Sequence, residues 1–91
     1  MADQTLPPVT VTVRFFAAAR AAAGVEEEFV SVPSPADIAD VVTAVVRLHG
    51  DRLAQVLRRC SFLLDETAVH GSATVVRPGA VLDVLPPFAG G

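Results

Sequence analysis

The hydrophobic and polar positions alternate most regularly near the start of the chain. Between Val9 and Phe15 every second residue is apolar, and threonine or arginine stands in between. Strict alternation with β-branched residues predicts a half-buried strand. Shorter apolar segments predict the other strands, at Phe29–Val32, Cys60–Leu64, Ala68-Val69 and Val81–Leu85. In the last strand Asp83 is expected to face solvent, since Leu82 and Val84 alternate with it and face the core.

A helical spacing of apolar residues separates the early strands from the late ones. Ile38, Val41, Val42 and Val45 recur at i, i+3, i+4 and i+7, which is typical of one buried helix face. A buried strand is the alternative for this valine-rich segment. The preceding Ser34-Pro35-Ala36-Asp37 predicts Ser34 as N-cap and Pro35 as the first helical residue. Shorter helices are predicted at Ala17–Ala23 and from Asp51 through Arg59, and Gly24 and Gly50 are expected to end helices.

The order of these elements predicts an α+β protein. Strands followed by a helix and further short strands favour an antiparallel sheet with the helices on one face. The 91 residues suffice for one domain. We therefore expect a flexible lead-in at residues 1–8, a folded domain at residues 9–85 and an extended tail at residues 86–91.

Composition excludes several kinds of chemistry. The net charge is −3 and the pI about 5.1, which disfavours nucleic acid as a partner. All seven basic residues are arginine, so Schiff-base chemistry and a lysine-dependent ATP site are excluded. His49 and His70 are expected at the surface, and no metal site is predicted. Cys60 is expected to be a buried, small apolar residue, with a nucleophilic role as the alternative. No signal-peptide pattern or apolar span is found, so a cytoplasmic location away from membranes is expected.

The final residues, Pro86-Pro87-Phe88-Ala89-Gly90-Gly91, hold the candidate functional group. Consecutive prolines favour an extended chain, and two glycines are slim enough to enter a narrow channel. A terminal Gly-Gly can also be incidental. The alternative that we develop is that the α-carboxylate of Gly91 reacts, while Pro86, Pro87, Phe88, Ala89 and Gly90 carry it into a partner's active site.

Activation of that carboxylate requires a partner. A carboxylate is ionised at neutral pH and is a poor acyl donor. The chain has neither a phosphate-binding loop nor a catalytic constellation of its own. The partner also needs a docking face on the folded body. Phe16 and Leu85, with Val69 or Ala68 beside them, are the candidates for that face.

The sequence resembles the ubiquitin-like sulfur carriers of the MoaD/ThiS type, and most closely the small subunits of molybdopterin synthase. The resemblance covers about residues 9–91 and rests on Val11–Ala17 with Arg20 and Gly24, on Ser34–Asp37, on Arg77-Pro78-Gly79 and on Val84–Gly91. It implies a β-grasp (ubiquitin-like) fold, in which a mixed sheet of about four to five strands packs on one main helix plus short helices. Asp65-Glu66 departs from the asparagine-containing turn that such carriers often have.

The resemblance also implies a function. An adenylyltransferase of the ubiquitin-activating type would use ATP to adenylate Gly91, and a sulfur donor protein would convert the adenylate to a thiocarboxylate. The carrier would dock on the large catalytic subunit of molybdopterin synthase in a heterotetramer. There it would donate sulfur to the pterin precursor in molybdenum cofactor biosynthesis, while binding no cofactor itself.

Three alternatives remain open. The carrier could serve thiamine or cysteine synthesis, although the length of the segment from Gly50 to Arg59 favours the molybdopterin type. The domain could instead be a non-reactive interaction module that uses its sheet. Gly91 could also be joined to lysines of other proteins, as in ubiquitin-type conjugation.

Overall fold

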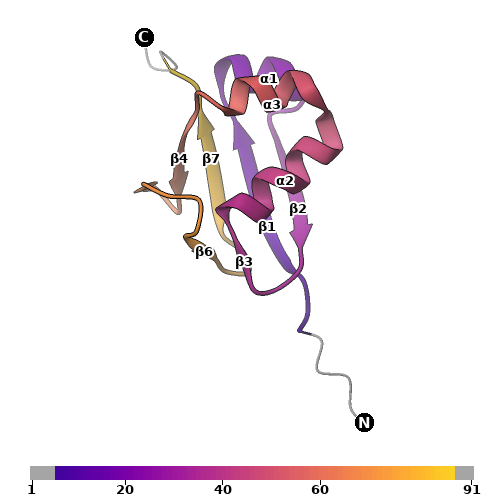
Figure 1. The fold of residues 1–91 in the computed structure, drawn as a ribbon, viewed down its shortest axis with the longest axis vertical. Coiled ribbons are helices and arrows are strands. Elements are labelled where there is room, and N and C mark those ends of the chain that lie inside the picture. Colours follow the sequence, from indigo (N-terminus) through magenta and orange to yellow (C-terminus); the bar gives the residue numbers. More distant parts are fainter. Residues whose placement is uncertain (1–5, 88–91) are drawn as a thin grey trace.

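Five strands form one mixed sheet in the order β2-β1-β7-β4-β5 (Figure 1). In this computed structural model, which describes residues 6–87, the strands are β1 (Val9–Phe15), β2 (Glu27–Val32), β4 (Ser61–Leu64), β5 (Thr67–Val69) and β7 (Val81–Leu85). β1 pairs antiparallel with β2 but parallel with β7. The antiparallel sheet expected from the element order is therefore wrong at this pair. The mixed sheet and β-grasp fold implied by the resemblance are confirmed.

Three helices pack on one face and one end of this sheet. They are α1 (Ala17–Ala23), α2 (Ile38–His49) and α3 (Asp51–Leu57). α2 crosses the sheet, while α1 and α3 lie together at one end of it (Figure 1). α1 ends as predicted, because Gly24 has φ +80° and donates its N–H to the Arg20 carbonyl. α3 ends at Leu57 rather than at Arg59, and no side chain caps its start. Within residues 6–87, no helix combines the length and apolarity needed to cross a membrane.

The start of α2 differs from the prediction. Asp37, not Ser34, is the N-cap: its Oδ1 accepts the Asp40 N–H at 2.9 Å, and the Asp40 carboxylate accepts the Asp37 N–H at 3.0 Å. The preceding residues form a two-stranded ladder of β3 (Ala36–Asp37) with β6 (Val75–Val76). The N–H of Ile38 also donates to the carbonyl of Thr74 at 3.0 Å. Pairing with β6 therefore keeps the residues before Asp37 out of the helix, and the reciprocal hydrogen bonds of Asp37 and Asp40 cap its first turn.

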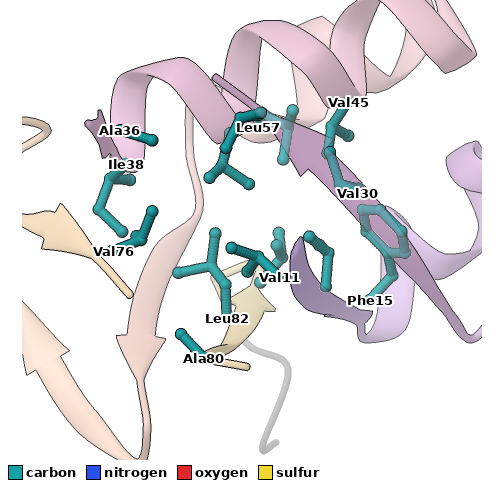
Figure 2. Packing of buried hydrophobic residues seen from close by; sticks show 14 of the residues in the cluster. Val11, Phe15, Val30, Ala36, Ile38, Val45, Leu57, Val76, Ala80 and Leu82 are labelled. Atoms are coloured by element: carbon teal, nitrogen blue, oxygen red, sulfur yellow. The ribbon is translucent and has the colours of Figure 1, made fainter. Parts of the chain in front are cut away.

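The core lies between the sheet and the helices. Figure 2 shows Val11, Phe15 and Leu82 of the sheet pointing toward Val45 of α2 and Leu57 of α3. The buried cluster also contains Val9, Val13, Ala19, Val30, Val32, Ala36, Ile38, Val41, Leu53, Val76, Ala80 and Val84. The inward faces predicted for β1 and β7 are confirmed. In α2, Ile38, Val41 and Val45 are buried and Val42 is partly buried, but Leu48, which the same spacing predicts to continue this face, is exposed.

The turn before β7 yields a prediction about stability. The Ala80 N–H donates to the Arg77 carbonyl at 3.1 Å, and Gly79 has φ +81°, as a type II turn requires. Gly79→Ala should lower the free energy of unfolding by about 1 kcal/mol, because a Cβ disfavours this backbone region. Urea unfolding measures the change.

Gly71→Ala is the matched control. A Cβ at either glycine meets open space, but Gly71 has no left-handed φ. Its substitution should leave the urea midpoint nearly unchanged. Equal effects of the two substitutions would contradict the conformational explanation.

Candidate functional site

The root of the C-terminal tail emerges from the middle of the sheet. Pro86 and Pro87 directly follow β7, which lies between β1 and β4. Pro86 is buried and Pro87 is exposed, so the body holds the root in place. This root lies at the end of the molecule where α1 and α3 lie (Figure 1). Phe88, Ala89, Gly90 and Gly91 lie outside the described residues, and the roles predicted for them remain predictions.

An ion pair occupies the outer face of the sheet beside this root. The register of β1 and β7 sets Arg14 opposite Asp83. The Arg14 Nε and Nη2 donate to the two carboxylate oxygens of Asp83 at 2.5 and 2.8 Å. This hydrogen bonding and the charge of Asp83 raise the pKa of the Arg14 guanidinium. The guanidinium also lies over the ring of Phe16, with 6.0 Å between its carbon and the ring centroid.

The expected exposure of Asp83 is therefore wrong, since only 5% of this residue is accessible. Alternation correctly assigned it to the face opposite the core, but Arg14 covers that position. Sequence reasoning missed the pair. The available signal was that both residues occupy polar positions in the two strands with the clearest patterns.

The structure brings together only part of the proposed docking face. Phe16 is exposed at the end of β1, and Leu85 is half-buried on the face that carries Asp83. Ala68 belongs to this face too, because Leu63 of β4 pairs with Ala68 on one side and with Asp83 on the other. Val69 belongs to the opposite face and packs against the core. Grouping Val69 with Leu85 is thus wrong, because the register of β5 decides the face. Docking through the other residues remains a prediction.

Cys60 lies in an environment that disfavours the reactive thiolate. It lies half-buried after α3, and its Sγ–H donates to the Val56 carbonyl at 3.3 Å. Burial raises the pKa of the thiol, which favours the neutral form over the reactive thiolate. The structure thus favours the apolar interpretation of this residue.

This environment predicts slow thiol modification. At pH 8 an aromatic disulfide reagent should react with Cys60 more slowly in the native chain than in urea, because burial raises the pKa of the thiol and lowers the fraction present as thiolate. Because the folded pKa is raised, folding should also lose stability as pH rises through the unfolded thiol's pKa. Equal rates in the native and unfolded chains would contradict this interpretation.

The two histidines have different environments. His70 is exposed, as expected. His49 is not a free surface residue: its Nε2 lies 2.5 Å from Glu28 Oε2, and its ring packs edge-to-face on Phe15 at 5.9 Å between centroids. Across residues 6–87, no three His, Cys, Asp or Glu side chains gather as metal ligands would.

Comparison with known families gives one match over most of the chain. The model of the ThiS family matches residues 13–91, from the middle of β1 to the terminal glycine. A comparison with curated proteins finds no match.

Several solved structures share the fold. The Haloferax volcanii HVO 2177 protein is 26% identical, with a TM-score of 0.79 and coverage of 100% of this chain and 94% of that one. One chain in the complex of subunits 1 and 2 of molybdopterin-converting factor from Helicobacter pylori 26695 is 25% identical. Its TM-score is 0.66, and the match covers 91% of this chain and 100% of that one. SAMP1 of Haloferax volcanii is 23% identical, with a TM-score of 0.78 and coverage of 90% and 99%.

Proposed function

We propose, from the premise that this chain belongs to the ThiS family, that it is a sulfur carrier that works through the carboxyl group of Gly91. The observation that carries the proposal is the family match, which extends through the tail to residue 91. The tail root supports it, because a strand at the centre of the sheet leads directly into Pro86 and Pro87.

The reaction that we propose has two steps. A Gly91 carboxylate oxygen attacks the α-phosphorus of ATP, which forms an acyl-adenylate and releases pyrophosphate. Hydrosulfide then attacks the acyl carbon, AMP leaves with the electron pair of the broken bond, and loss of the sulfur-bound proton leaves a thiocarboxylate. The partner supplies the nucleotide site. The carrier supplies a tail whose root is held by the sheet, and this limits the entropy lost when the tail binds.

Within this class we propose the molybdopterin pathway. The Helicobacter pylori structure is a complex of subunits 1 and 2 of molybdopterin-converting factor, which supports a large catalytic subunit as the second partner. The thiocarboxylate would donate its sulfur to the pterin precursor in that subunit's active site. A heterotetramer, with two carriers on a dimer of large subunits, is the assembly that we expect.

The experiment is a mass measurement on the intact chain. The protein is incubated with the ubiquitin-activating-type adenylyltransferase of the same organism, ATP and hydrosulfide. We expect exchange of one C-terminal oxygen for sulfur, which depends on ATP. The product is then added to the large subunit and the pterin precursor, where dithiolene formation is expected. No exchange would contradict the carrier function, whereas exchange without dithiolene would contradict only the molybdopterin assignment.

A second candidate is protein modification. The chain shares its fold with SAMP1 of Haloferax volcanii. A second structure with this fold, from the same organism, is described as small archaeal modifier protein 1. The same Gly91 adenylate would then be attacked by a lysine amine of another protein. Peptide mass spectrometry of cell extracts tests this, because it would find the C-terminal residues of this chain linked to lysines elsewhere.

A further inference from the structure

A concavity with both polar and apolar lining lies directly against the root of the tail. Its volume is about 400 Å³, and its lining combines the polar side chains of Arg52, Gln55 and Arg59 with the apolar residues Ala18, Val56, Pro86 and Pro87. Arg52 and Gln55 come from α3, and Arg59 follows that helix. The two arginines are exposed. The concavity thus sets two guanidinium groups beside the point from which the tail departs.

Charge is unevenly distributed around this point. The whole chain has a net charge of −3. The segment from Asp51 to Cys60 is nevertheless basic, because Arg52, Arg58 and Arg59 outnumber its one acidic residue, Asp51. The arginines beside the tail root therefore form a local positive region on an acidic protein.

Within the described part of the chain, neither arginine of this region is held in an ion pair. Among residues 6–87, the ion pairs involve Arg14, Arg20 and His49, and neither Arg52 nor Arg59 has an acidic partner. Exposed arginines without partners are tolerated in water. They become costly if another protein covers them without supplying a carboxylate.

We propose that Arg52 and Arg59 dock an acidic edge of the enzyme that adenylates Gly91. This inference rests on the proposed function, which requires that enzyme to take in the tail. An enzyme surface that surrounds the tail must also approach Pro87 and therefore the rim of this concavity. Carboxylates at that place pair with the guanidinium groups, and they steer the carrier so that its tail meets the channel.

The test measures how carrier concentration affects adenylation, followed as pyrophosphate release by the adenylyltransferase that sulfurates the wild-type chain. The double variant Arg52→Glu/Arg59→Glu should have an apparent KM about tenfold higher at low salt, because two attractive pairs become repulsive. The kcat should stay near the wild-type value. Added salt should raise the KM of the wild type and lower that of the variant.

Two controls separate charge from folding. Arg52→Lys/Arg59→Lys keeps the charge and should keep the KM within about threefold of the wild type. Arg47→Glu changes an exposed arginine that lines a different concavity, between β2 and α2, and should have little effect. Thermal unfolding of the free double variant should match that of the wild type.

The outcomes are distinguishable. An unchanged KM in the Glu double variant, an effect equal to that of Arg47→Glu, or a matching loss of folding stability would overturn the docking inference while leaving the sulfur carrier function intact. If the wild-type chain releases no pyrophosphate with the adenylyltransferase, the proposed function and this inference both fail.

Discussion

Deletion of Gly91 should leave a folded protein that no longer takes up sulfur. The shortened tail would place its carboxylate about 3.3 Å short of the adenylation site. A displacement of about 1 Å can reduce a rate about a hundredfold, so we expect the loss to be at least that large. Pyrophosphate release and the intact mass of the product measure it.

Thermal unfolding provides the control for this deletion. The described core runs from Val9 to Val84, so the melting temperature should not change. Gly91→Ala is the matched variant, because it keeps the tail length and adds one methyl group; it should retain more activity than the deletion. Wild-type rates of sulfur uptake without Gly91 would contradict the assignment of this residue.

Leu82→Ala should have the largest effect on stability. Leu82 is 1% exposed and lies in β7, next to β1 and β4 at the centre of the sheet. Replacing a buried leucine by alanine costs about 2–5 kcal/mol. That is a large part of the total stability of a small domain, about 5–15 kcal/mol. Urea unfolding should show a loss of about 3 kcal/mol.

Leu85→Ala is the matched control, with the same truncation in the same strand but on the outer face. Leu85 is only half-buried, so the loss should be about 1 kcal/mol or less. If the docking prediction holds, this variant should instead bind its partner more weakly. Equal losses of stability in the two variants would contradict the assignment of faces in β7.

Local sequence patterns predicted the elements better than their pairing. The alternation from Val9 to Phe15 and the spacing from Ile38 to Val45 each reflect one buried face, and both were confirmed. The parallel pairing of β1 with β7 has no counterpart in such patterns, because alternation reveals a face and not a strand direction. The start of α2 was missed for a related reason, because the residues directly before it pair with β6 instead of joining the helix.

The same distinction between local patterns and strand pairing applies to the candidate site. The location of the tail root followed from β7 and the two prolines after it. The burial of Asp83 did not, because it depends on a long side chain from another strand. Val69 was grouped with the wrong face because that assignment requires the register of β5. Both errors concern pairing between strands, which alternation within one strand does not reveal: β1 with β7 for Asp83, and β5 with β4 for Val69.

The position of β7 has a consequence for incomplete chains. β7 joins β1 to β4, so a chain that stops before Val81 loses the strand that links the two halves of the sheet. Such a fragment cannot close its core and becomes a substrate for proteases. We therefore expect chains that lack this strand and the tail to be degraded, rather than to accumulate and compete with the intact chain for its partners.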